Sequence, residues 1–477
     1  MKKIIAFISV TLVIALLLTG CAFFGGDTTD ATQDGAQDGA VVDDTNAPTL
    51  NGEKITKYSI VYSDADLDYS LRAAEYIKSE ILARTGFELA IAEDDAEATA
   101  NEIVVGETSR EISKNLDADT TGFEFALLAD GGKIALEGDY FVIAAAAYYF
   151  VETYIPSSAF DTTVPAEVAV HEPIMAETKS VVLLIGDGMG VYQSKMFDYM
   201  DNTYDFGDGE DLFYGYLFPS EGRCVTNSLT GTTDSAAAAT ALATGYKTEN
   251  GFVGRDPYGN DLVSITELAA SLGKSTAIMS TEASTGATPS GFSAHANNRD
   301  NKAEILETQT ALTASAGTIF KCNYNLFAKN QLAVIEGYVT DTLTKLEADE
   351  NGFFLMYEEA HIDKNSHNNE MVDTFRSLIR FNQIIARFME YAFYNPGTAV
   401  LITADHETGD LYPDENGALK YHSEGHTPAN VPLFAYGMGT EVFNRAEVDN
   451  TQIPKTIAYW WGVTDFGDQT TAGPVIK

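Results

Sequence analysis

Basic residues are scarce in this chain of 477 residues: 29 lysines and arginines stand against 70 aspartates and glutamates, a formal charge of −41. A protein that binds the nucleic-acid backbone needs a basic face, so this balance argues against a nucleic-acid partner. The chain as a whole would also repel a small anion. A site for such an anion therefore requires local positive charge, from basic side chains or from bound cations.

Cysteine is also rare, with only Cys21, Cys224 and Cys322. So few cysteines exclude a small domain built on a disulfide framework. Cys224 and Cys322 could pair in an exported protein, but their spacing leaves the question open, and neither lies at metal-ligand spacing. Apolar residues make up 45% and aromatic residues 11%, which suits globular domains, roughly two or three at this length.

The sequence has no apolar run long enough for a comfortable membrane span. The apolar residues 4–18 follow two lysines and lead into Leu18-Thr19-Gly20-Cys21, a pattern typical of an export signal. The last four residues resemble a bacterial lipobox, which implies removal of residues 1–20 and lipidation of Cys21; plain secretion is the alternative. We expect a protein of the cell envelope, lipid-anchored to the outer face of a bacterial membrane. Residues 21–52, acidic and rich in small residues, are expected to be a flexible linker.

Residues 53–175 are expected to form a small α+β domain. Strands are predicted at 58–62 and 102–106, a helix at 67–84 and another at 141–154. Residues 123–128 and 133–137 flank Asp130-Gly131-Gly132, which indicates a hairpin. This order resembles the accessory domain that precedes the catalytic domain in some glycoside hydrolases. The resemblance is one of pattern and implies no chemistry, so we treat the domain as accessory.

Residues 178–477 show apolar strands that alternate with helices. The runs 180–185, 352–357 and 398–403 are almost wholly apolar, as expected for strands covered on both faces. An amphipathic helix is predicted over residues 371–392. The expected fold is α/β: a doubly wound, mostly parallel sheet with helices on both faces.

Acidic residues or histidine follow each of the three predicted strands. The first is followed by Gly186-Asp187-Gly188, the second by Glu358, and the third by Asp405 and His406. Ligands of such sheets bind beyond the carboxyl ends of the strands, so these side chains should meet at one edge.

Carboxylates and imidazoles gathered in one place are typical of divalent-metal sites, and their combination favours zinc. Asp363 and His367 are four residues apart, and His426 follows further on, which together provide ligands for more than one ion. Bound cations would reverse the local field of this acidic chain. Ser235 precedes an alanine run that favours a helix, so it is predicted at a helix N-terminus, as a nucleophile or as an ordinary N-cap.

These residues resemble the alkaline phosphatases closely, and the resemblance covers essentially all of residues 178–477. It is carried by five blocks in order: residues 185–190, residues 233–235, Thr288-Pro289 with Arg299, residues 352–367, and residues 403–406 with His426. The resemblance implies a phosphate monoesterase with two zinc ions and one magnesium ion. The implied ligands are Asp363, His367 and His426 for the first zinc, Asp405 and His406 for the second, Thr288 and Glu358 for magnesium, and Asp187 as a bridge between the second zinc and magnesium.

The resemblance further implies a role for three side chains at the substrate. Ser235 would attack phosphorus in line and form a phosphoseryl intermediate, which a hydroxide held by zinc would split. Arg299 would clamp two phosphoryl oxygens, which a planar guanidinium can do and an ammonium cannot. Lys364, beside Asp363, either reaches phosphate through water or is an ordinary surface lysine.

The chain departs from the family pattern at two places. Gly286 stands where many relatives place an aspartate or histidine near the magnesium. Only 59 positions separate Arg299 from Glu358, which is short for the family and leaves a homodimer and the substrate range open. The remaining histidines match no ligand position and are interpreted as structural; they are His171, His295, His361 and His422.

Two alternatives remain to be weighed against a monoesterase. A sulfatase needs a Cys/Ser-x-Pro-x-Arg segment, which is not present, and related diesterases usually carry threonine as nucleophile and lack the arginine clamp. A metal-dependent phosphate-binding or adhesion lipoprotein without turnover is the alternative from another class.

Overall fold

The computed structural model describes residues 45–64, 69–116, 125–138, 142–170, 178–200, 213–323, 332–395, 397–437 and 439–476. The expected export signal, Cys21, most of the expected linker and His171 lie outside these ranges. No helix in the described ranges combines the length and the apolar character needed to cross a bilayer.

The N-terminal region contains a six-stranded sheet in the order β4-β3-β5-β7-β6-β9. The strands are β3 (Tyr58–Tyr62), β4 (Ala90–Glu93), β5 (Asn101–Val105), β6 (Phe125–Asp130), β7 (Lys133–Gly138) and β9 (Glu167–Val170). The predicted hairpin is present as the antiparallel pair β6–β7, while β3, β4, β5 and β7 pair in parallel. The two predicted helices are α1 (Tyr69–Thr85) and α3 (Val142–Tyr154), which pack against each other. The region also contains β1 (Thr49–Leu50), β2 (Glu53–Lys54), α2 (Glu111–Lys114) and β8 (Asp161–Thr162).

The C-terminal region is built on an eight-stranded sheet in the order β13-β12-β14-β10-β15-β20-β11-β21. In chain order the strands are β10 (Ser180–Gly186), β11 (Ser220–Val225), β12 (Ser275–Ser280), β13 (Ile319–Cys322), β14 (Phe353–Glu359), β15 (Thr398–Thr403), β20 (Val431–Tyr436) and β21 (Glu447–Asp449). Only β20 runs antiparallel to its neighbours. The expected mostly parallel sheet is therefore confirmed.

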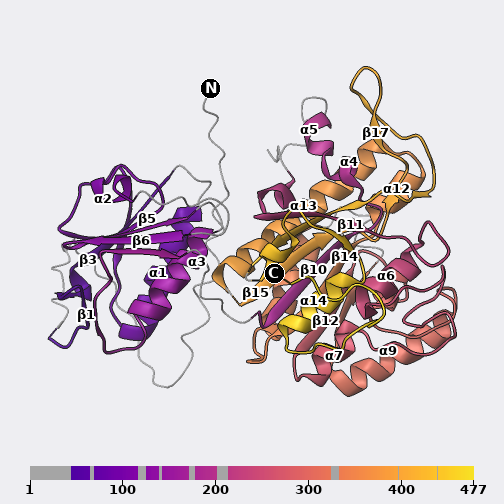
Figure 1. Ribbon diagram of the computed structural model, residues 1–477, viewed down its shortest axis with the longest axis horizontal. Coiled ribbons are helices and arrows are strands. Elements are labelled where there is room, and N and C mark those ends of the chain that lie inside the picture. The colour runs from indigo at the N-terminus through magenta and orange to yellow at the C-terminus, as the bar shows by residue number, and fades with distance from the viewer. Residues whose placement is uncertain are drawn as a thin grey trace, which may run out of the picture. The chain divides into compact units, whose positions relative to one another are not determined.

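Helices cover both faces of this sheet (Figure 1). On one face α13 (Met371–Tyr394) packs on β10 and β15, and α11 (Leu332–Leu346) packs beside it. On the other face α7 (Ile265–Ser271) packs on β12 and β14, with α14 (Gln452–Trp460) and α9 (Lys302–Ala316) next to it. The predicted amphipathic helix is α13, which buries Phe375, Leu378, Phe381, Ile385 and Phe388. Shorter helices are α4 (Val191–Ser194), α5 (Met196–Met200), α6 (Ser235–Thr244), α8 (Ala287–Gly291) and α12 (His361–His367).

The register of the central strands brings the ends of β10, β14 and β15 level with one another at one edge of the sheet. Every residue of β10, β14 and β15 is buried, which explains why these strands are nearly wholly apolar in sequence. Ile185 lies beside Glu358 on one side and Thr403 on the other. Glu358 itself is part of β14, one residue before its end, whereas the sequence pattern placed it after the strand.

The alanine run forms α6 because its small side chains allow close packing as well as helix formation. All ten residues of α6 are buried, and a methyl group added at Gly291 of α8 would lie 2.6 Å from the Ala239 Cβ. The helix begins at Ser235, but its N-cap is Asp234, whose carboxylate accepts a hydrogen bond from the Ala237 amide. Ser235 is thus the first helical residue rather than the cap, and its hydroxyl is left for other contacts.

Cys224 and Cys322 are both free thiols. Burial raises the pKa of Cys224 to about 12, so this thiol stays protonated and inert.

Candidate active site at the carboxyl edge of the large sheet

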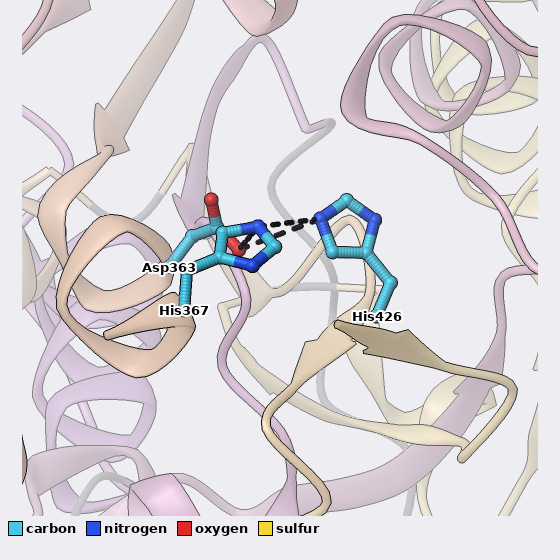
Figure 2. A group of neighbouring side chains, drawn as sticks. All are labelled: Asp363, His367 and His426. Carbon is cyan, nitrogen blue, oxygen red and sulfur yellow. Dashed lines mark hydrogen bonds and ion pairs between the residues drawn. The ribbon is translucent and has the colours of Figure 1, made fainter. Parts of the chain in front are cut away.

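Asp363, His367 and His426 bring three donor atoms to one point (Figure 2). The His367 Nε2 lies 3.1 Å from the His426 Nε2 and 3.3 Å from the Asp363 Oδ1, and the remaining pair is 3.6 Å apart. Ligands about 2.0–2.1 Å from a tetrahedral zinc ion are separated by roughly 3.3 Å, so the triangle has the size of such a site.

The two imidazoles face each other with lone pairs. The His367 Nδ1 donates to the Glu424 carbonyl, and the His426 Nδ1 donates to the Thr233 carbonyl at 2.9 Å. Since a carbonyl only accepts, Nδ1 carries a proton in each ring, and the neutral form of each ring, which is the form that binds metal, presents a lone pair on Nε2. Two lone pairs 3.1 Å apart beside a carboxylate repel, and a shared cation removes that repulsion.

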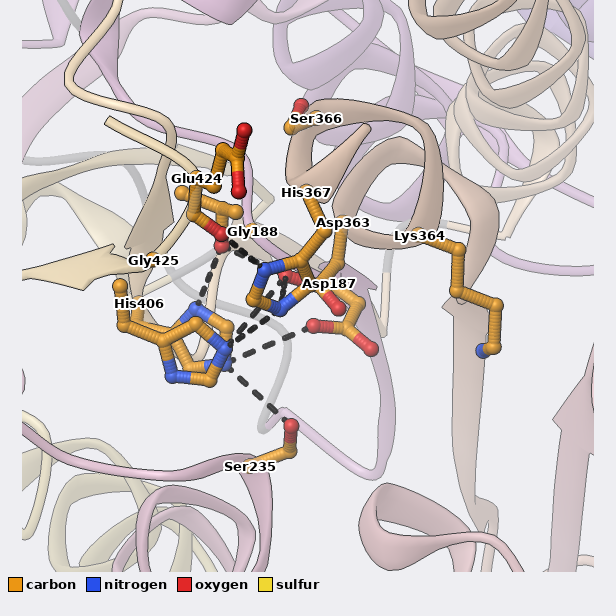
Figure 3. Close-up of polar contacts among 12 residues, drawn as sticks. Asp187, Gly188, Ser235, Asp363, Lys364, Ser366, His367, His406, Glu424 and Gly425 are labelled. Atoms are coloured by element: carbon orange, nitrogen blue, oxygen red, sulfur yellow. Dashed lines mark hydrogen bonds and ion pairs between the residues drawn. The ribbon is translucent and has the colours of Figure 1, made fainter. Parts of the chain in front are cut away.

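Asp187, Asp405 and His406 form a second, buried triad. Figure 3 shows Asp187 and His406 of this triad beside Ser235. The His406 Nε2 lies 3.2 Å from the Asp405 Oδ2 and 3.7 Å from the Asp187 Oδ1. The Asp405 Oδ1 accepts from the amides of Gly188 and His406, but among the described residues Asp405 Oδ2 and Asp187 Oδ1 have no hydrogen-bond partner. Buried carboxylate oxygens without partners are costly, so these donors fit a divalent cation.

Thr408 connects the two triads. Its hydroxyl donates to the Asp363 Oδ1 at 2.5 Å and lies 3.2 Å from the His406 Nδ1. Because the hydroxyl proton is used on Asp363, the oxygen accepts from the His406 Nδ1–H. The His406 Nε2 therefore also presents a lone pair to the carboxylates. Burial keeps this ring neutral by lowering the pKa of His406 to about 3.

Glu358 lies close to Thr288 and to Asp187. The Ser280 hydroxyl donates to the Glu358 Oε2 at 2.5 Å, whereas the Glu358 Oε1 is buried and has no hydrogen-bond partner in the described part of the chain. Burial, and then the charge of Glu282, raise the pKa of Glu358 to about 8. Burial and the carboxylates of Asp405, Asp363 and Glu358 raise the pKa of Asp187 well above its usual range. These oxygen donors suit a hard cation such as magnesium, which would hold the carboxylates ionised.

Ser235 lies at the edge of the second triad. Its Oγ is 3.3 Å from the His406 Nε2. Asp234 accepts from the Gly251 amide at 3.1 Å and from the Arg299 Nη1 at 3.1 Å, while also capping α6. One carboxylate thus holds both the helix that begins at Ser235 and the guanidinium of Arg299.

Residues 178–413 match the model of the alkaline phosphatase family, in two overlapping segments, 178–338 and 329–413. Through this region the chain belongs to the alkaline phosphatase family. It is therefore an enzyme, and all the ligand candidates taken from the family resemblance, except His426, lie inside the matched segments.

Relatives agree with this assignment, and a solved structure shares the fold. The chain is 27% identical to alkaline phosphatase 3 of Bacillus subtilis over 328 residues, which cover 58% of this chain and 70% of the relative. It is 28% identical to alkaline phosphatase 4 of the same organism over 306 residues, 52% of this chain and 66% of the relative. In fold it resembles the alkaline phosphatase of the Antarctic bacterium TAB5, with a TM-score of 0.52, 24% identity, and coverage of 61% of this chain and all of that one.

The structure groups the two triads with Ser235, Lys364 and Glu358, and it holds Arg299 against Asp234. Asp363, Lys364 and His367 lie on α12, and β19 (His426–Thr427) pairs with β16 (Glu407–Thr408), so that Thr408 faces His426 across the ribbon. Gly188 has a φ of +74°, which glycine adopts readily. A Cβ at this position would also lie 2.8 Å from the Asp363 Cα, so the close approach of the two segments requires glycine.

Three of the remaining histidines lie in the described residues, and each has contacts or burial that suit a structural role. His295 contacts Glu267 at 3.1 Å, His422 stacks on Tyr412, and His361 is buried, which lowers its pKa to about 3.

Two polar residues at this edge of the sheet were not predicted from the sequence. One is Thr408, which gives no signal of its own. The other is Glu282, which follows β12, the fourth parallel strand to end here; its Oε2 pairs with the Lys364 Nζ at 2.9 Å. Residues 275–280 are apolar at their centre and are followed by Thr281 and Glu282, the same signal that identified the other three strands. Lys364 is thus held by an ion pair, and its side chain is 35% exposed.

Proposed function

We propose that this protein hydrolyses small phosphate monoesters to an alcohol and inorganic phosphate, through a phosphoseryl intermediate on Ser235. Asp363, His367 and His426 would hold one zinc ion. Asp405 and His406, with Asp187, would hold a second zinc. Asp187, Thr288 and Glu358 would hold magnesium.

The facing lone pairs of His367 and His426 carry this proposal. They lie 3.1 Å apart beside the Asp363 carboxylate, with both Nδ1 atoms committed to carbonyls. The second triad adjoins them through Thr408, and its His406 lies next to the Ser235 hydroxyl. A nucleophile beside two zinc-sized donor sets is the arrangement that two-metal phosphoryl transfer needs.

The bound ions would supply Lewis acidity that lowers the pKa of the Ser235 hydroxyl and stabilises the leaving oxygen. Ser235 Oγ forms a bond to phosphorus while the bond from phosphorus to the ester oxygen breaks, and the alcohol leaves with a proton. Water then adds to phosphorus, the Ser235–phosphorus bond breaks, and Ser235 regains its proton as inorganic phosphate departs. The N-terminus of α6 faces the anionic group throughout.

Arg299→Lys is expected to lower kcat/KM for an aryl phosphate by roughly a hundredfold, because an ammonium cannot hold two phosphoryl oxygens in the fork geometry. Steady-state kinetics measure the loss. Arg255→Lys is the matched control, because Arg255 is also an ion-paired arginine, bound to Asp261 and Glu304 outside the candidate site. Equal kinetics for Arg299→Lys and the wild type would contradict the clamp.

The proposed function is tested by metal analysis of the purified chain together with rates on an aryl phosphate and on the matching bis-aryl phosphate. We expect two zinc ions and one magnesium ion per chain. We also expect a much higher kcat/KM for the monoester, because a monoester has three unesterified oxygens, two for Arg299 and one for the bound ions, whereas a diester has only two. A preference for the diester would favour the diesterase alternative instead. Turnover by the metal-loaded chain also separates an enzyme from a phosphate-binding lipoprotein. Export, lipidation of Cys21 and a homodimer stay predictions from the sequence.

A further inference from the structure

Gly286 is a glycine for reasons of space. Its φ of −59° is open to any residue, so the backbone does not require glycine. A Cβ at this position would instead lie 1.7 Å from the Glu282 Oε1 and 2.2 Å from the Glu282 Cδ. The carboxylate of Glu282 therefore fills the space into which a side chain at position 286 would project.

Glu282 is also held toward the buried carboxylates of the site. Its amide donates to the Ser280 Oγ at 2.9 Å, and that same hydroxyl donates to Glu358. Its Oε2 pairs with the Lys364 Nζ at 2.9 Å, and Lys364 also donates to the Ala360 carbonyl at 3.1 Å. Glu282 thus contacts α12, which carries candidate ligands, directly through Lys364, and it is linked to Glu358 of β14 through Ser280.

Lys364 lies among carboxylates of the site, and the charges of Glu282, Asp187 and Glu358 all act on its ammonium. The guanidinium of Arg299 acts on Asp187 and Glu282 as well. Within the described residues, the Glu358 Oε1 is buried without a hydrogen-bond partner. A bound cation at this place would satisfy that oxygen.

We propose that Glu282 is a further acidic residue of the magnesium site, beyond the direct ligands. From the end of β12 it supplies the carboxylate that Gly286 cannot supply, because glycine has no side chain. This inference rests on the proposed function. Glu282 acts from outside the direct ligands Asp187, Thr288 and Glu358: it adds negative charge and accepts hydrogen bonds from the water that magnesium retains. At the same time it fixes Lys364 beside the site. Glu282 is a positioning residue in this scheme.

Magnesium titration of the full-length, zinc-loaded chain by calorimetry tests the proposal. Glu282→Gln keeps the shape and removes the charge, so magnesium should bind about tenfold more weakly or worse, with zinc content unchanged. Glu304→Gln is the matched control, because Glu304 is likewise partly buried in an ion pair, with Arg255. The control should bind magnesium as the wild type does.

A second pair of variants uses the geometry of Gly286. Glu282→Ala should lose magnesium affinity as Glu282→Gln does. Adding Gly286→Asp to Glu282→Ala should restore most of it, because a carboxylate at position 286 then enters the vacated space. Wild-type magnesium affinity in Glu282→Gln, or no recovery in the double variant, would overturn the proposal. If the wild-type chain itself bound neither zinc nor magnesium, the proposed function would fail with it.

Discussion

Ser235→Ala is expected to lower kcat on an aryl phosphate by at least about a thousandfold and to leave no phosphoryl group on the chain. The reason is that Ser235 is the only hydroxyl in the described residues recorded within hydrogen-bond distance of the His406 Nε2. Zinc content should stay at the wild-type level, because Ser235 belongs to neither triad. Acid-quench trapping of the phosphorylated chain, followed by mass spectrometry of the peptide that contains Ser235, measures the intermediate directly.

Ser228→Ala is the matched control for this variant. Ser228 and Ser235 are equally buried, each 5% exposed, but the Ser228 hydroxyl contacts only its own turn, at Thr230 and Gly231. The control should therefore keep its activity. A trapped phosphoryl group on the Ser235→Ala chain would assign the nucleophile to another residue.

Removing the cations is expected to abolish activity and to make stability depend on pH. Burial raises the pKa of Glu358 to about 8 and that of Asp187 well above its usual range, so the folded metal-free chain binds protons that the unfolded chain has lost by neutral pH. The free energy of unfolding should therefore fall between about pH 7 and pH 8, by up to about 1.4 kcal/mol per pH unit for each such proton. Bound cations replace those protons, so the loaded chain should lack this loss.

Urea unfolding at several pH values above about 7, with chelator or with zinc and magnesium, measures the effect. This range avoids His406, whose lowered pKa acts in the opposite sense at acidic pH. Glu137 of the N-terminal sheet, whose pKa burial raises to about 7, titrates in both forms and cancels in the difference. Activity that survived complete metal removal would point instead to a Ser235–His406 pair working without metal.

The strands that hold the ligands were predictable because burial on both faces leaves a local mark. Each of β10, β14 and β15 is wholly buried and nearly wholly apolar. In each case the acidic residue or histidine of the site stands at the end of the strand or just after it in the sequence. The rule that parallel strands end at one sheet edge then places Asp187 near Asp405 without coordinates. By contrast, the roles of Thr288 and Arg299 came from the family resemblance, since nothing in their local pattern indicates a site.

Glu282 escaped prediction because its strand, β12, was not recognised. Thr408 was not predicted because its role depends on Asp363, which is 45 positions away in the sequence.

The sequence by itself determined which donor atoms reach the sheet edge, because a strand's burial and the residue that follows it are local properties of the chain. Only the tertiary structure decided how those atoms face one another. The Nδ1 atoms of His367 and His426 donate to backbone carbonyls, and Glu282 fills the space beside Gly286. These arrangements depend on segments distant in the chain meeting at the edge of one sheet, and no local periodicity records such meetings.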